Sequence, residues 1–298
     1  MKDIYSEVTD RIIEQLEAGF IPWSKPWTGI SDGAISRATG RAYSLINQML
    51  LNRPGEYVTF KQCKDEGGHV KKGAKSKFVV FWKVYRREKK DSGGAVIRDA
   101  DGKPVMESIP VLRYFNVFHI DDCEGITAKY PNGARNTAHI DGDADSVLHG
   151  YVDREGIDLE IKQSDRAYYS PSFDRIVLPR VDQFDDTSEF YSTAFHEATH
   201  STGHKSRLNR FTGEAANAAF GSETYSKEEL VAEIGAACIL HELNMETSDS
   251  FRNSAAYIQS WLKVLKNDKR MIISAASRAE KAVKLILNIN DSSTEEAA

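Results

Sequence analysis

The pentapeptide His196-Glu197-Ala198-Thr199-His200 constrains this chain more than any other feature of its sequence. On an α-helix, residues four apart lie one turn above each other, so both imidazoles would project from one face toward one ion. Glu197 lies slightly around the helix, where a carboxylate can take a proton from a metal-bound water. Residues 187–202 have an apolar side, with capping residues before them and Gly203 after them, which predicts the required helix. The pentapeptide therefore predicts a catalytic zinc site.

A catalytic zinc needs a third protein ligand and an open position for water. The favoured candidate is Glu229, near the start of a second helix that we expect to run to about residue 243. Ser226 and Glu229 have the spacing of a capping box, which alone would explain both residues. However, Glu229 and Glu233 also lie one turn apart among small and apolar residues, and a buried carboxylate needs a partner. Glu233 would then orient a ligand histidine, while Glu228, Glu233 and His204 remain alternatives as third ligand. We expect Zn²⁺ as the cation, with Mn²⁺ as the alternative.

Composition limits the class of protein. The chain has 298 residues, 41% hydrophobic and 28% charged, which is typical of a soluble globular protein with two domains. Its cysteines are isolated (Cys63, Cys123 and Cys238), so we expect no disulfide framework and a reducing cytoplasm. The N-terminal segment predicts an amphipathic helix over residues 3–18 rather than a signal peptide, and no apolar run is long enough to span a membrane.

The pattern of predicted elements indicates an α+β protein with two domains. A small mixed α/β domain would cover residues 1–125, a linker 126–143, and a mostly helical zincin-like domain with a small sheet 144–298. Before the linker we expect strands at 77–86 and 111–118, with the charged segment 89–103 as an exposed hairpin tip. After it we expect a helix at 144–154, strands at 157–161, 167–170 and 176–178, and closing helices at 250–266 and 270–288. The last two of these strands would form a hairpin directly before the zinc helix.

A block of positive charge lies in the first half of the chain. Residues 25–90 hold 15 basic and 5 acidic side chains, whereas residues 131–298 have a net charge of −9. A single-stranded nucleic acid needs stacking planes interleaved with cations, and this block has both. The candidate DNA-binding residues are Trp23, Lys25, Trp27, Arg41, Tyr43, Lys61, Lys71, Lys72, Lys75, Lys77 and Trp82. The alternative is that the aromatic residues build the core, with Phe78, Val80 and Trp82 facing inward, and that the cations form a solvated face.

Several stretches in both halves carry a family resemblance: IPWSKPW, TGRAYSLIN, YVTFKQ, GGHVKKG, AYYSPSFDRIVLP, HEATHSTGH and RLNR. In this order they resemble plasmid antirestriction proteins of the ArdC type. The resemblance implies a domain that binds single-stranded DNA, followed by a zinc-peptidase-like domain, acting when plasmid DNA enters a recipient during conjugation. It also implies metal ligands at His196 and His200, a catalytic carboxylate at Glu197, and Glu229 as third ligand. One departure is the charged stretch 89–103, which is less charged in the family.

Three hypotheses of function follow. The first is a zinc metalloprotease tethered to single-stranded DNA, whose substrate is a protein of the host restriction machinery. The second is a binding protein that coats the entering strand, with a metal site that is structural or inactive. The third is a protein that engages a restriction enzyme directly without any affinity for DNA.

Overall fold

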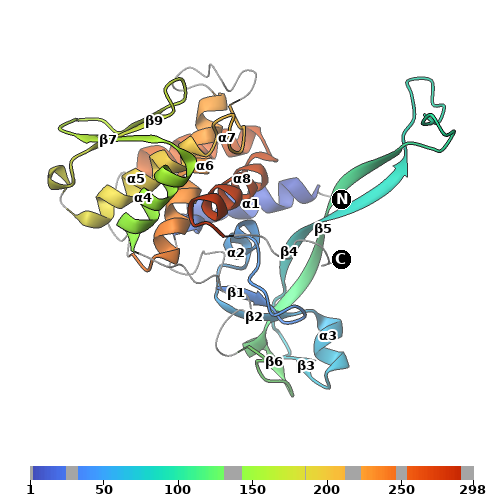
Figure 1. Cartoon of the computed structure of the whole chain (residues 1–298). Helices are drawn as coiled ribbons and strands as arrows, with labels where there is room; N and C mark the ends of the chain where they lie inside the picture. The colour runs from blue at the N-terminus through green and yellow to red at the C-terminus, as the bar shows by residue number, and fades with distance from the viewer. Residues whose placement is uncertain are drawn as a thin grey trace.

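The computed structural model describes residues 3–24, 33–130, 143–184, 186–211, 223–245 and 254–289. Within these ranges it contains eight α-helices and three small sheets, which confirms the α+β class (Figure 1). The helices are α1 (Ile4–Glu17), α2 (Leu45–Leu51), α3 (Phe60–Asp65), α4 (Ala144–Glu155), α5 (Thr187–Ser201), α6 (Glu223–Glu242), α7 (Ser254–Asn267) and α8 (Met271–Ile286). The strands are β1 (Ala34–Ser36), β2 (Gly55–Val58), β3 (His69–Val70), β4 (Lys77–Glu88), β5 (Met106–His119), β6 (Cys123–Glu124), β7 (Asp158–Lys162), β8 (Tyr168–Ser170) and β9 (Arg175–Pro179).

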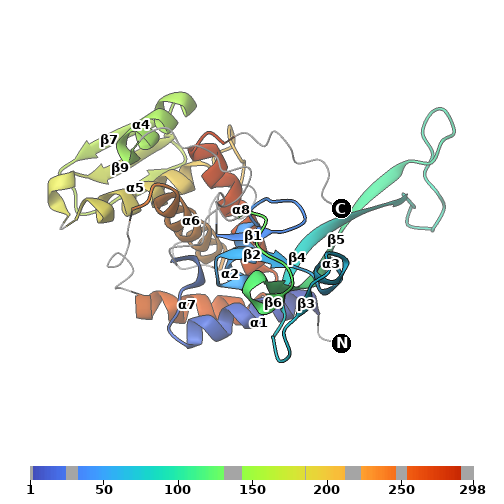
Figure 2. The same ribbon diagram turned by 90° about the horizontal axis from the view of Figure 1, so that it is seen from below.

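A long two-stranded arm extends from the N-terminal sheet, whose strand order is β1-β2-β5-β4. Strand β2 pairs with β5 only at Phe118 and His119, and among the described strands the rest of β5 pairs with β4 alone. Figures 1 and 2 show this pair leaving the body of the molecule. The predicted hairpin tip at 89–103 is confirmed, but β5 begins before the predicted residue 111. The extra length includes Pro110, which a strand tolerates where no further strand pairs with it.

The first residues of the predicted linker 126–143 are tied to the N-terminal sheet. The carboxylate of Glu56 on β2 accepts a hydrogen bond from the backbone N–H of Lys129 at 2.9 Å. The same carboxylate pairs with the buried guanidinium of Arg37, which also donates to the carbonyl of residue 127. The start of this segment is therefore hydrogen-bonded to the N-terminal sheet, while residues 131–142 lie outside the described residues.

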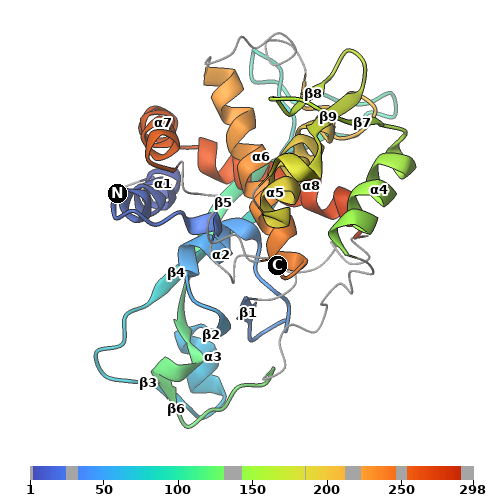
Figure 3. The same cartoon turned by 90° about the vertical axis from the view of Figure 1, so that its left-hand side faces the viewer.

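The N-terminal helix packs on the C-terminal half of the chain. Helix α1 lies beside α7, as Figures 2 and 3 both show. Behind it, the ring of Trp23 meets the ring of Trp261 edge to face, with centroids 5.1 Å apart. Trp23 is 1% exposed, and both tryptophans belong to a core cluster that draws on both halves. The boundaries of the predicted domains 1–125 and 144–298 stay a prediction.

The C-terminal half places a small sheet against α5. Its strand order is β7-β9-β8, with β7 parallel and β8 antiparallel to β9. The predicted hairpin before the zinc helix is confirmed, since β8 and β9 pair across the turn at residues 171–174 and α5 follows. Helix α5 contacts β8, β9 and α6. No helix in the described part of the chain is long and apolar enough to cross a membrane.

Candidate metal centre

Helix α5 forms where the sequence predicts it. The side chain of Asp186 accepts a hydrogen bond from the backbone N–H of Ser188 at 2.7 Å, which caps the first turn. Phe190, Phe195 and Ala198 are buried on the side of the helix that faces the core. The helix is therefore held at its start and along one face, and the histidines project from a fixed scaffold.

Three side chains from two helices converge on one point. His196 Nε2 lies 3.1 Å from His200 Nε2, and the carboxylate oxygens of Glu229 lie 3.5 and 3.3 Å from these two atoms. At zinc–ligand distances of about 2.0–2.1 Å, tetrahedral geometry separates neighbouring ligand atoms by about 3.3 Å. The three residues thus have the donor types and the spacing of a catalytic zinc site with an open fourth position. The set also fits Mn²⁺, because manganese accepts imidazole and carboxylate ligands.

A second layer of carboxylates lies behind the imidazoles. Glu233 Oε1 is 3.7 Å from His196 Nδ1, on the side away from the convergence point. Glu228 Oε1 is 3.7 Å from His200 Nδ1, so it supports this histidine rather than joining the cluster. His204, the other alternative as third ligand, turns toward Ser206, whose hydroxyl is 2.7 Å from its Nδ1. Of the four alternatives, the structure brings Glu229 to the two histidines.

The electrostatics of the centre favour a charged Glu229 and a cation beside it. Burial opposes a positive charge on His200, but the carboxylates of Glu228 and Glu229 outweigh it and raise the pKa of this imidazole to about 10. Burial also opposes a charged Glu229, but the neighbouring His196 and His200 lower its pKa well below the usual range. Burial raises the pKa of Glu233, and the nearby Glu229 carboxylate adds to this effect. A metal ion would take the place of the proton on His200, so we expect binding to release protons.

Glu197 is buried beside the cluster, at 9% exposure. Its negative charge acts on His200 and favours a cation there. Thr199, two residues after Glu197, packs against Gly235 of α6. A Cβ atom at Gly235 would lie 2.7 Å from Thr199 Cγ2, closer than atoms can pack. Gly235 therefore allows α5 and α6 to approach closely enough for Glu229 to reach the histidines.

The loop at residues 207–210 (RLNR) supports the site, and the residue pattern alone did not predict this role. Arg207 donates to the carbonyl of Ser201 at 2.8 Å and pairs with Asp174 in the turn between β8 and β9. Arg210 donates to the carbonyl of Thr199 at 2.8 Å and through Nε to Glu228 at 3.1 Å. Both arginines therefore donate to carbonyls in the last turn of α5 and connect this end of the helix to the sheet and to α6. The sequence signal that could have indicated this role is the pair of arginines three residues apart directly after the helix.

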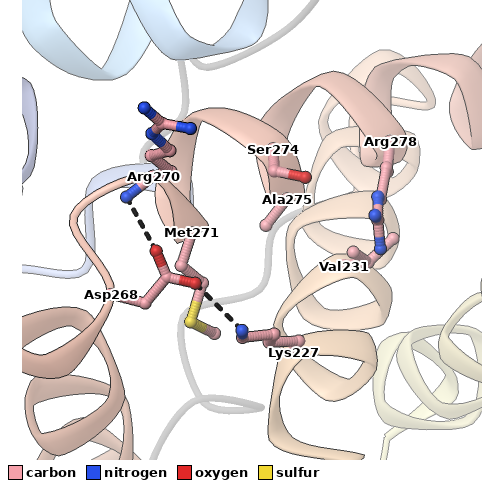
Figure 4. A pocket seen from close by; sticks show the side chains of 8 residues that line it. All are labelled: Lys227, Val231, Asp268, Arg270, Met271, Ser274, Ala275 and Arg278. Atoms are coloured by element: carbon pink, nitrogen blue, oxygen red, sulfur yellow. Dashed lines mark hydrogen bonds and ion pairs between the residues drawn. The ribbon is translucent and has the colours of Figure 1, made fainter. Parts of the chain in front are cut away.

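A pocket of about 210 Å³ lies between α6 and the start of α8 (Figure 4). Its acidic residue, Asp268, pairs with Lys227 at 2.9 Å and accepts a hydrogen bond from the backbone N–H of Arg270 at 2.9 Å. Lys227 and Val231 are the residues of α6 that line it. Because Glu229 lies two residues from each of them, it projects from the opposite side of the helix. The pocket is thus separate from the metal centre.

The structure divides the predicted DNA-binding residues. Lys61, Lys71, Lys72, Lys75, Lys77 and Trp82 are exposed, and Arg41 and Tyr43 are half-buried. Trp82 is 48% exposed, whereas Phe78, Val79 and Val80 are all buried, so β4 is covered on both faces at its base and the predicted inward position of Trp82 is wrong. The prediction that Trp23 stacks on bases is wrong for this structure, because its ring lies in the core. Lys25 and Trp27 lie outside the described residues.

Comparisons with known proteins match both halves of the chain. Residues 2–118 match the N-terminal domain of the anti-restriction factor ArdC, and residues 147–278 match the zincin-like metallopeptidase family. The crystal structure of the metal-free antirestriction ArdC protein from the R388 plasmid is similar, with a TM-score of 0.70 and 34% identity. The similarity covers 96% of this chain and 97% of that one. The Mn(II)-bound structure of the same protein gives the same TM-score and identity. These matches agree with a two-domain architecture and with Zn²⁺ or Mn²⁺ as the cation.

Relatives of different lengths are similar to this chain in sequence. An uncharacterized protein, y4eC, from Sinorhizobium fredii is 30% identical over 93% of this chain and 89% of its own length. Two DNA primases named TraC from Escherichia coli are each 33% identical over 99% and 96% of this chain. The chain spans only 20% and 27% of the length of these two primases.

Proposed function

Since this chain belongs to the family of antirestriction proteins of the ArdC type, we propose that it is a metal-dependent peptidase that binds single-stranded DNA and protects it from restriction during conjugation. The observation that carries the peptidase part is the convergence of His196, His200 and Glu229, with Glu197 buried beside them. Buried carboxylates and imidazoles need partners, and one cation between His196, His200 and Glu229 would serve all three at once.

In this proposal each residue of the centre has a separate role. His196, His200 and Glu229 hold the metal, which when bound supplies a Lewis acid and lowers the pKa of a bound water. Glu197 would be the base that accepts a proton from water and gives it to the leaving amine of the peptide. Glu233 would orient His196, because its carboxylate lies 3.7 Å from Nδ1, the ring nitrogen that points away from the convergence point.

The peptide substrate would lie along the edge of the small sheet. Strand β8 is an edge strand of the order β7-β9-β8, and it contacts α5. An extended peptide can pair with such an edge through its backbone, which places a carbonyl group near the helix. Asp174 and Arg207 would hold this edge in position, since they connect the β8–β9 turn to the end of α5.

The DNA-binding part is supported by the exposed cations of the N-terminal half. Lys61, Lys71, Lys72, Lys75 and Lys77 all lie on the surface around α3 and the start of β4. Each phosphate that a lysine neutralises would add affinity that depends on salt. The alternative function, a binding protein with an inactive metal site, needs only this half.

One substitution separates these functions. Glu197→Gln should retain the metal and the affinity for an oligonucleotide but lose peptide cleavage, because the amide cannot accept the proton. The control is Glu189→Gln on the same helix, which should leave all three measurements unchanged. Metal content, oligonucleotide affinity and cleavage of a peptide library would be measured for both variants, together with protection of incoming plasmid DNA. If Glu197→Gln protects DNA fully, proteolysis is dispensable and the binding function stands alone.

A further inference from the structure

The arm of β4 and β5 carries a row of aromatic and basic side chains on one of its two faces. Successive side chains of a strand point to opposite faces, so the register determines which residues share a face. Phe81 lies opposite Arg113, and Lys83 opposite Val111, while Phe115 lies on the same face one step further along β5. We call Phe81, Lys83, Tyr85, Arg113 and Phe115 the aromatic face of the arm.

Two rings of this face, those of Phe115 and Tyr85, are exposed, and the ring of Phe81 is half-buried. Phe81 and Phe115 stack in parallel, with centroids 4.7 Å apart and 4° between the planes. Phe115 is 54% exposed and Tyr85 is 37% exposed. Soluble proteins rarely leave such a contiguous apolar surface bare unless it binds something.

Cations surround the outermost ring. The Arg113 guanidinium carbon lies 5.8 Å and the Lys83 ammonium 5.4 Å from the centre of the Tyr85 ring. Arg113 also donates a hydrogen bond to the Tyr85 hydroxyl at 2.9 Å, and this contact lowers the pKa of the tyrosine. Residues 77–119 hold nine lysines and arginines against five aspartates and glutamates, a net charge of +4. The charge of the arm thus complements a polyanion.

The other face of the arm is less suited to a long ligand. At its base, Phe78 and Val80 are buried, and the Arg11 guanidinium covers the Phe78 ring at 4.6 Å. Trp82 lies on that face too, with its ring 6.4 Å from the ring of Tyr5 on α1. The body of the protein therefore contacts this face as far out as Trp82. On the aromatic face, the buried residues of the two strands are Val79 and Val117 at the base, whereas Phe115, Arg113, Lys83 and Tyr85 are exposed.

We propose that single-stranded DNA binds along the aromatic face, with bases stacked on Phe115 and Tyr85 and phosphates held by Arg113 and Lys83. This inference rests on the proposed DNA-binding function and assigns its track. Phe115 lies opposite Val79, so Phe115 and Tyr85 are six positions apart along the arm, or about 20 Å, which leaves room for two separately stacked bases. Stacking requires unpaired bases, so a single strand is the occupant and a duplex is not.

The test uses the full chain and matched pairs of variants. Phe115→Ala is paired with Tyr114→Ala, its neighbour on β5 with the same 54% exposure but on the opposite face. Arg113→Gln is paired with Arg98→Gln in the hairpin tip. Fluorescence anisotropy of a labelled oligothymidine gives the affinity over a series of salt concentrations, and thermal unfolding verifies the fold of each variant.

We expect Phe115→Ala to weaken binding about 5- to 150-fold and Tyr114→Ala to change it little. Arg113→Gln should reduce the slope of log affinity against log salt by about 0.7, and Arg98→Gln should not. Equal affinity of Phe115→Ala and the unchanged chain, or an equal loss in Tyr114→Ala, would overturn the inference. Photo-crosslinking of oligothymidine to the unchanged chain should label peptides that contain Tyr85 or Phe115, and labels elsewhere only would also overturn it. If the unchanged chain has no affinity for oligothymidine, it is the proposed DNA-binding function that fails.

Discussion

Replacing Gly235 by alanine should loosen the metal centre without altering any of its ligands. Gly235 lies in the interior of α6, where it meets Thr199 of α5. A methyl group there would stand 2.7 Å from Thr199 Cγ2 and 2.8 Å from its Oγ1. Carbon atoms pack at about 3.5–4.0 Å, so the helices would have to separate by about 1 Å.

The magnitude follows from two opposing effects. Overpacking a core costs about 1–3 kcal/mol, whereas alanine in a helix interior is favoured over glycine by about 1 kcal/mol. The expected result is a net loss of about 1 kcal/mol in the free energy of unfolding. The metal should respond more strongly, because ligand distances tolerate only about 0.2 Å and Glu229 moves with α6. Zinc affinity should fall about 10- to 100-fold, as for other changes in the residues that support a metal site.

Urea unfolding in the presence of a chelator measures the change in the free energy of unfolding. Competition with a chromophoric chelator measures zinc affinity. The matched control is Gly150→Ala in α4, where a Cβ would have no heavy atom within 4 Å. This variant should be stabilised by about 0.5–1 kcal/mol and should bind zinc normally. The double variant Gly235→Ala, Thr199→Ala removes the colliding atoms, and the lost Thr199 hydroxyl has no hydrogen-bond partner in the described part of the chain. It should recover most of the zinc affinity. A Gly235→Ala protein that is stabilised like the control, or a double variant no better than the single one, would refute the reasoning.

Two further predictions concern ion pairs, one beside the metal centre and one at the end of α3. Arg210→Gln should lower the free energy of unfolding by about 2–4 kcal/mol, because it leaves the Glu228 carboxylate buried without its guanidinium; urea unfolding checks this. Arg37 and Lys129 lower the pKa of Glu66 to about 2, so its charge contributes stability that is fully present above its ordinary pKa and lost as the pH falls through about 2. Glu66→Gln should therefore be less stable than the unchanged chain near neutral pH, and the difference should vanish below about pH 2, as acid unfolding curves will show.

The metal centre could be predicted largely because its information is local. The spacing of His196 and His200 implies one face of one helix, whatever the rest of the fold. Glu229 was a candidate because carboxylates among alanines need a partner, but its reach depends on Gly235, a contact between helices that no spacing encodes. The capping box at Ser226 does not form, since α6 begins at Glu223 and Ser226 lies inside the helix.

The aromatic residues could not be sorted into core and surface from the sequence. Trp23 follows a proline in a stiff segment and looked like a stacking plane, yet its neighbours are residues of α6 and α7, far away in the chain. On β4 the alternation predicted that Trp82 faces inward like Phe78 and Val80. However, the strand leaves the body of the protein after Val80, so Trp82 is exposed. The length of the arm is set by the pairing of β4 with β5. This pairing between distant residues determines which side chains lie beyond the body and are exposed.

The position of α1 has a practical consequence for anyone who wishes to study the two halves separately. A fragment that starts at residue 144 would lack the helix that covers α7 and the indole that fills the space beside Trp261. Such a fragment would present bare apolar surface to water and would tend to aggregate, so its inactivity would say nothing about catalysis. A peptidase fragment should instead carry residues 3–24 joined to its own N-terminus, because these residues complete the core of the C-terminal half.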